Sequence, residues 1–236
     1  ANRLFGRGSD GTPREGSIAV LFVGKRPPAG IPCMQMAMGG QDPEGGKRAL
    51  GQESTGVLGR AWFDLKNSNF ATNNTGTSPG LGVFPGELFL YQANLYQALY
   101  PGYITTFGRR FRLLSPHLGG TPAGSHPEDA VALAPEFDFT QATAAQRSRY
   151  LAVFEAADDL AVALGALLAH ETGHSLGLVA PGAPPEGLWG DASLHNHYGQ
   201  PQDLMNAVVG YDALIEELYQ FRALNRAYLR EQILLR

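Results

Sequence analysis

The sequence predicts an α+β fold, in which short strands from the first part of the chain are combined with helices from the last part. The 236 residues include 30 Gly and 16 Pro, and these are concentrated outside two segments of helical composition. Hydrophobic residues make up 44% of the chain and charged residues 17%, an ordinary balance for a globular protein. With no internal repeat and no clear linker, we expect residues 1–236 to form a single domain.

Three segments have the composition of β-strands. Residues 17–23 are rich in β-branched side chains and lie between two glycines, which is the pattern of a bounded strand. Residues 57–65 and 87–91 are the second and third candidates. Residues 66–80 are rich in Asn, Thr, Gly and Ser, so we expect a long surface loop there.

Helical composition follows from residue 142, where Ala, Leu, Glu, Gln and Arg become frequent. Asp158 or Asp159 is a candidate N-cap for a helix that runs to about residue 175, because an acidic side chain is favourable at the positive end of a helix. Leucines at three- to four-residue spacing give this helix a face to bury. Gly177 then supplies a residue that can adopt the left-handed turn at a helix end.

The last part of the chain predicts a loop and then a helix. The loop, rich in Pro and Gly, covers residues 180–201, and a final amphipathic helix is expected to start at Asp212. Its apolar residues are Leu214, Ile215, Leu218, Phe221, Leu224, Tyr228 and Leu229. We expect this apolar face to pack on the body of the domain.

His170, Glu171 and His174 form an H-E-x-x-H motif near the end of the first predicted helix. Residues four apart lie on the same face of a helix, so the two imidazoles can bind one zinc ion. Glu171 follows His170 directly, and its carboxylate can reach the attacking water without ligating the metal. The motif therefore predicts a zinc site in which Glu171 takes a proton from water and delivers it to a leaving amine.

The motif continues to Gly177, and the resulting string H-E-x-x-H-x-x-G resembles the metzincin clan of zinc metallopeptidases. In that clan the glycine turns the chain so that a third ligand comes from the following loop, and a methionine-containing turn lies below the zinc. Residues 203–206, Asp-Leu-Met-Asn, resemble that turn, with Met205 as the methionine. Residues 56–63 resemble the edge strand that pairs with extended substrate at the rim of the cleft.

The resemblance implies two subdomains with a cleft between them. The upper subdomain, of about residues 1–177, is expected to contain a mixed twisted sheet and helices that include the active-site helix. The small lower subdomain, residues 178–236, is expected to contain the methionine turn and the C-terminal helix.

The sequence departs from the metzincin pattern at the third histidine. The usual position is three residues after the glycine, and it is Ala180 here. The next candidates are His195 and His197, which would follow an inserted loop, as leishmanolysin-type metzincins tolerate. His197 lies eight residues before Met205, an interval that resembles matrixins, and a flexible loop brings His195 equally within reach. Asp191 is a weaker third candidate.

The resemblance implies a zinc-dependent endopeptidase that acts on a protein or peptide, with one catalytic Zn²⁺ and Glu171 as general base. Calcium is also compatible with such an enzyme, although no pattern in the sequence supports it. One alternative is a gluzincin-like peptidase with Glu216 or Glu217 as third ligand, which Gly177 and the methionine turn disfavour. The other is a non-catalytic zinc-containing binding module, which would need no general base.

Charge and cysteine content bear on partners and compartment. The formal net charge is −4 with no long basic run, so nucleic acid is not expected as a partner. No apolar run reaches the length of a membrane span, and the first residues do not have the pattern of a signal peptide. Cys33 is the only cysteine, which excludes an intrachain disulfide. A secreted or periplasmic location is favoured, with the cytoplasm as the alternative, and a monomer is assumed.

Overall fold

A computed structural model describes residues 1–25, 27–29, 31, 33–43, 55–68, 81–89, 110–116, 119–197, 200, 202–216 and 219–233. The chain divides into two compact units. The first consists of residues 1–91 and 163–236, and the second of residues 92–162. Helices and a small mixed sheet make up the described part, which confirms the α+β class. The division into subdomains at residue 177 stays a prediction.

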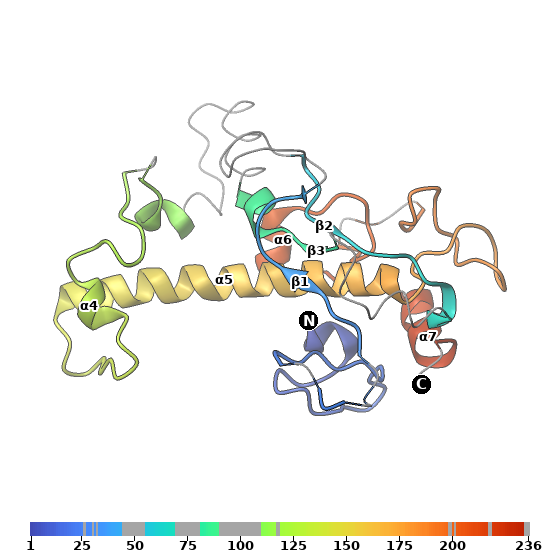
Figure 1. Ribbon diagram of the computed structural model, residues 1–236, viewed down its shortest axis with the longest axis horizontal. Helices are drawn as coiled ribbons and strands as arrows, with labels where there is room; N and C mark the ends of the chain where they lie inside the picture. Colours follow the sequence, from blue (N-terminus) through green and yellow to red (C-terminus); the bar gives the residue numbers. More distant parts are fainter. Residues whose placement is uncertain are drawn as a thin grey trace. The chain divides into compact units, whose positions relative to one another are not determined.

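Figure 1 labels the strands and the α-helices and colours the chain from its N-terminus to its C-terminus. In chain order the named elements are η1 (Asn2–Phe5), β1 (Ala37–Met38), β2 (Gly59–Arg60), η3 (Leu65–Asn67), β3 (Gly82–Val83), η4 (Arg112–Leu114), α4 (Asp129–Ala132), α5 (Ala144–Ser175), α6 (Tyr211–Ile215) and α7 (Ala223–Glu231). Although α5 has 32 residues, neither it nor any other helix in the described ranges is long and apolar enough to cross a lipid bilayer.

The sheet has the order β1-β3-β2 and is mixed. β1 runs parallel to β3, with Ala37 opposite Gly82, and β2 runs antiparallel to β3, with Gly59 opposite Val83. Just beyond the ladder, the Phe84 N–H donates to the Leu58 carbonyl at 2.9 Å. Because β3 is central, β2 forms one edge of the sheet as far as the described strands go.

The first unit has a core built from distant parts of the chain. Its fully buried side chains include Phe5, Ile18, Leu88, Leu178, Leu204, Met205, Leu214 and Leu229. The loop after α5, the segment around Met205 and the helix α7 therefore each contribute fully buried apolar side chains to this unit.

The second unit has a buried ion pair between α4 and α5. The Arg149 Nε lies 2.6 Å from Asp129 Oδ1, and both side chains are 5% exposed. Asp129 also accepts the N–H groups of Gly124 and His126 at 2.7 and 2.9 Å. The hydrogen bond from Arg149 holds the pKa of Asp129 well below its usual range, so the carboxylate stays charged.

α5 begins much earlier than the sequence-based prediction. Thr143 precedes the helix, its hydroxyl accepts the Gln146 N–H at 3.2 Å, and the Gln146 side chain accepts the Thr143 N–H at 2.9 Å. This reciprocal pair is a capping box, which satisfies two N–H groups at the helix start. The prediction that Asp158 or Asp159 caps the helix was wrong, since both lie inside it.

α5 ends at Ser175, close to the predicted end, and Gly177 follows with φ +99°. A side chain at Gly177 would also collide with the Leu65 Cα, 2.9 Å from an ideal Cβ. The Tyr228 O–H donates to the Leu176 carbonyl at 2.8 Å and accepts the Lys66 N–H at 2.6 Å. Burial raises the pKa of Tyr228 to about 12, so the phenol remains a donor and joins α7 to the end of α5.

The strand predicted over residues 17–23 was wrong, because no strand forms there. The Phe22 N–H donates to the Asn2 side chain at 3.0 Å, and the Ile18 N–H donates to the Phe5 carbonyl at 2.9 Å. This segment therefore satisfies backbone groups with η1 and a side chain, and needs no neighbouring strand.

The other two predicted strands were shortened or replaced. Only Gly59–Arg60 of residues 57–65 is a strand, and the segment ends in η3. Residues 85–89 are helical, which overturns the strand predicted from Glu87, because Pro85 suits the first position of a helix. Residues 90 and 91, and most of the predicted loop 66–80, lie outside the described residues.

The single helix predicted from Asp212 is two helices, α6 and α7. Between them, the Leu204 N–H donates to the Gln220 carbonyl at 2.8 Å, and the Gln220 N–H donates to the Gln202 carbonyl at 3.0 Å. Gln220 is therefore extended and paired with the chain around Met205, which interrupts the helical pattern.

Candidate metal centre

The last turns of α5 carry His170, Glu171 and His174, all of them buried, at 8%, 5% and 9% exposure. Four residues separate the histidines, so a single helical turn places both rings on one face. Their ring centroids lie 4.7 Å apart. The sequence-based placement of this motif near the end of a helix is confirmed.

Backbone carbonyls fix the tautomer of both rings. The His170 Nδ1 lies 2.6 Å from the Leu204 carbonyl oxygen, and the His174 Nδ1 lies 2.7 Å from the Leu178 carbonyl oxygen. A carbonyl oxygen only accepts, so each Nδ1 carries a hydrogen and each Nε2 of a neutral ring presents a lone pair. The two Nε2 atoms face each other at 3.1 Å.

Burial keeps these rings neutral. It lowers the pKa of His170 to about 3 and that of His174 to about 4. A neutral imidazole with a free Nε2 lone pair is the form that ligates a metal. Two such lone pairs 3.1 Å apart repel each other unless a cation lies close to both.

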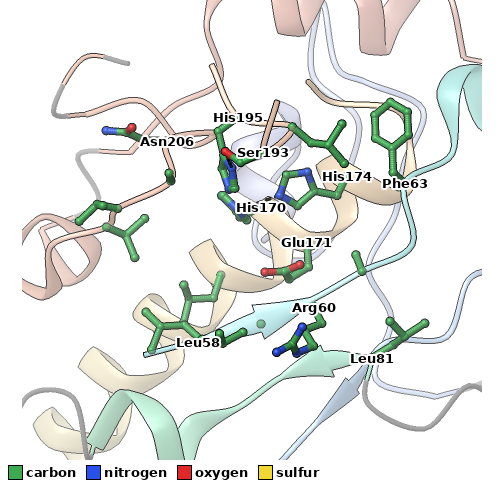
Figure 2. A pocket seen from close by; sticks show the side chains of 18 of the residues that line it. Leu58, Arg60, Phe63, Leu81, His170, Glu171, His174, Ser193, His195 and Asn206 are labelled. Carbon is green, nitrogen blue, oxygen red and sulfur yellow. Dashed lines mark hydrogen bonds between the residues drawn. The ribbon is translucent and has the colours of Figure 1, made fainter. Parts of the chain in front are cut away.

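His195 completes the cluster from the loop that follows α5. Its ring centroid lies 5.3 Å from that of His170 and 5.0 Å from that of His174, and ligand atoms of the three residues lie within 4.8 Å of one another. Figure 2 shows the three rings gathered above Glu171. The His195 Nδ1 lies 3.0 Å from the Ser193 hydroxyl, so its Nε2 is also available.

These three histidines lie close enough to bind one metal ion. Imidazole nitrogens at about 2.0–2.1 Å from a tetrahedral zinc ion are separated by roughly 3.3 Å, close to the 3.1 Å between the Nε2 atoms of His170 and His174. Within the described residues the cluster contains no fourth histidine, cysteine or carboxylate. Three protein ligands with an open position are typical of catalytic zinc sites.

The other candidate ligands lie elsewhere. His197 is exposed and is not in the cluster; its N–H donates to the Trp189 carbonyl at 3.3 Å. Asp191 supports the loop of His195 through hydrogen bonds. Glu216 ends α6, is exposed and lies outside the cluster, and Glu217 lies outside the described residues.

Glu171 extends from α5 toward β2 (Figure 2). An ideal Cβ on Gly59 would lie 2.7 Å from the Glu171 Cγ and Cδ, so Gly59 leaves the room that this side chain occupies. Burial raises the pKa of Glu171 to about 8, while the nearby positive charge of Arg60 acts in the opposite direction. Arg60 itself is held by Asp42 through two hydrogen bonds of 2.9 and 3.0 Å.

Met205 lies directly behind the metal-ligand motif. It is fully buried, and an ideal Cβ on Gly173 would lie 2.7 Å from its sulfur. The Met205 carbonyl accepts the Asn196 N–H at 2.9 Å, next to His195 in the chain. Asn196 also donates to Asp203 at 2.7 Å, so the turn around Met205 and the loop of His195 are tied together.

The cluster opens into a cavity of about 660 Å³. Its lining includes the segment 56–63, which contains β2, and residues 206–209 after the Met205 turn. Leu58, Leu81, Leu167, Val208 and Val209 give it an apolar lining beside Glu171. The cavity therefore places an apolar lining next to the three histidines and Glu171.

Ser193 and Gly59 belong to this site, although sequence reasoning did not single them out. The signal for Ser193 was the D-x-S-x-H spacing, since Asp and Ser often bond the backbone two residues on. Gly59 had no such signal, because its contact with Glu171 joins residues far apart in the chain.

Comparisons with known proteins name no relative. No family model, no curated protein and no solved structure matches this chain.

Proposed function

We propose that this chain is a zinc-dependent endopeptidase that resembles the metzincins, with His170, His174 and His195 as ligands and Glu171 as general base. The observation that carries the proposal is the convergence of three neutral imidazoles beside a buried carboxylate at the wall of a cavity. A zinc ion held there would act as a Lewis acid and lower the pKa of water to about 7.

Glu171 is suited to the proton transfers of peptide hydrolysis. Its carboxylate takes the proton from the attacking water and passes it to the nitrogen of the leaving amine. Burial raises the pKa of Glu171 to about 8, so the carboxyl group can hold a proton at neutral pH until the amine leaves. Glu171 follows His170 on α5, so its carboxylate lies near the three histidines without being a member of the cluster.

β2 supports a peptide as the substrate. Among the described strands, β2 lies at an edge of the sheet, which is the position where an extended peptide can add as a further strand. Eight consecutive residues, 56–63, line the cavity, so the pairing can extend to both sides of the scissile bond. This arrangement favours cleavage within a chain and an apolar side chain next to the cleavage site.

The two alternatives receive less support. A gluzincin-like site needs a glutamate ligand, and Glu216 lies outside the histidine cluster. A structural zinc site in a binding module usually closes with a fourth protein ligand and needs no general base. The cluster of described residues has three ligands and Glu171 at its side.

The test is zinc content, measured by elemental analysis, with casein cleavage on the same samples. Wild type should hold about one zinc ion per chain and cleave casein. His170→Ala and His195→Ala should lose both properties, and Glu171→Gln should keep zinc and lose cleavage. His197→Ala is the matched control and should keep both.

Two results would contradict the proposal. Wild type that binds no zinc after reconstitution would remove the metal site. If wild type and Glu171→Gln both bind zinc and neither cleaves casein, the result would favour the binding module.

A further inference from the structure

The three histidines are held in different ways. His170 and His174 donate their Nδ1 hydrogens to the carbonyls of Leu204 and Leu178, which are fully buried backbone positions. His195 is half-buried, and its Nδ1 meets the hydroxyl of Ser193, an exposed side chain. The third imidazole is therefore oriented by a group that a single substitution can remove.

Ser193 is itself held by Asp191. One carboxylate oxygen of Asp191 accepts the Ser193 hydroxyl at 2.7 Å, the Ser193 N–H at 2.8 Å and the His195 N–H at 3.0 Å. A carboxylate only accepts, so the Ser193 hydroxyl donates to it, and its oxygen is left to accept the hydrogen on His195 Nδ1. The direction of this relay leaves His195 Nε2 without a hydrogen.

The loop backbone is closed around the same residues. The Asp191 N–H donates to the His195 carbonyl at 2.8 Å, and the Val179 N–H donates to the Leu194 carbonyl at 2.9 Å. On the other side of His195, Asn196 is anchored to Met205 and Asp203. With the backbone fixed on both sides, the remaining freedom of His195 is the rotation and tautomer of its ring.

We propose that Ser193 and Asp191 are positioning residues that select the tautomer and orientation of His195, and so set how tightly the site holds its metal. This inference rests on the proposed metal site. Partners of metal-bound histidines of this kind typically contribute 10- to 100-fold to metal affinity. Of the three proposed ligands, His195 is therefore the one whose hydrogen bonds are most easily removed, and its displacement should weaken metal binding.

The test compares Ser193→Ala with Ser193→Thr and with Ser148→Ala, an exposed serine on α5 in the second unit. The zinc dissociation constant is measured by competition with a chromophoric chelator, and the visible absorption of the Co²⁺-substituted protein reports ligand geometry. Ser193→Ala should weaken zinc binding by roughly 10- to 100-fold and change the Co²⁺ spectrum. Ser193→Thr, which keeps the hydroxyl, should restore both, and Ser148→Ala should match wild type.

Asp191→Asn separates the two residues of the relay. The amide oxygen can still accept the three hydrogen bonds, so its effect on affinity should be smaller than that of Asp191→Ala. Thermal unfolding of the metal-free variants serves as the folding check. Because Ser193 is exposed, its variants should unfold within a few degrees of wild type.

Failures of the two proposals are distinguishable. Wild type that binds neither Zn²⁺ nor Co²⁺ would overturn the metal site and the inference with it. Wild type that binds zinc and cleaves casein, with Ser193→Ala unchanged in affinity and spectrum, would overturn this inference alone. Unchanged Ser193→Ala and weakened Ser193→Thr would also contradict it.

Discussion

Gly59→Ala offers a sharp test of how Glu171, the proposed general base, is positioned. Gly59 lies in β2, and an added Cβ would lie 2.7 Å from the Cγ and Cδ of Glu171, whereas ordinary contacts begin near 3.4 Å. The carboxylate Oε1 would lie closer still, so the Glu171 side chain must withdraw by at least about 0.7 Å or rotate away. Its retreat moves the carboxylate relative to the attacking water while leaving the three histidines in place.

The size of the effect follows from that displacement. A misplacement of about 1 Å in a reacting group can cost about 100-fold in rate. We therefore expect kcat/KM to fall by roughly 30- to 100-fold, equivalent to about 2–3 kcal/mol of transition-state stabilisation. Zinc affinity and the Co²⁺ spectrum should stay at wild-type values, because the three atoms nearest to an added Cβ at Gly59 all belong to Glu171.

The assay is casein cleavage with zinc content measured on the same samples. Gly24→Ala is the matched control, because an added Cβ at Gly24 meets nothing within 4 Å. Gly59→Ala with wild-type activity would refute the reasoning, since the edge strand would then yield in place of the carboxylate. Loss of zinc from Gly59→Ala would equally refute it, because the effect would lie with the ligands.

Three further predictions concern stability. Arg149 depresses the pKa of Asp129 in the folded protein, so the carboxylate stabilises the fold above its ordinary pKa of about 3.9, and this contribution is lost as the pH falls below that value. Between about pH 5 and 2, the melting temperature of Asp129→Asn should therefore fall less steeply than that of wild type, and identical slopes would contradict this. Tyr228→Phe leaves the Leu176 carbonyl and the Lys66 N–H without their phenol partner, and should lower the free energy of unfolding in urea by about 1–3 kcal/mol. A change within error would show that water replaces the phenol. Gly173→Ala puts a methyl group 2.7 Å from the Met205 sulfur, and this overpacking should lower the free energy of unfolding by about 1–3 kcal/mol. Unchanged stability would mean that Met205 has room to move.

The parts of the fold that were predictable are those that local sequence determines. The two histidines of α5 need only helical spacing to share a face, and Gly177 needs only its own conformation to turn the chain. The start of α5 was also encoded locally, in the T-x-x-Q pattern of Thr143 and Gln146, but the acidic pair further along suggested a later start.

The strands were harder because their pairing joins distant segments. β2 and β3 lie about twenty residues apart in the chain, and each pairs over two residues. Residues 17–23 have strand composition, yet Asn2 and Phe5 satisfy their backbone. Composition shows that a segment can form a strand, whereas neighbouring parts of the chain decide whether that strand pairs in a sheet.

The third histidine of the cluster shows the same limit in the site itself. Intervals along the chain left His195 and His197 open, because an interval says nothing about which side chain a loop turns inward. The choice is made by hydrogen bonds: Asp191 and Ser193 orient His195, while the His197 backbone joins Trp189.

The length of the loop between Gly177 and His195 then has little bearing on the geometry of the site. The Leu188 N–H donates to the Ala180 carbonyl at 2.8 Å, so the proline-rich excursion returns to its starting point before Asp191 begins. Entropy of loop closure grows slowly with length, so such an excursion costs little once its ends are joined. The position of the D-x-S-x-H segment therefore depends on the contact between Ala180 and Leu188 more than on the length of the chain between them. In a site of this kind, the third ligand is better sought from a local hydrogen-bonding pattern around the histidine than from its distance to the helix.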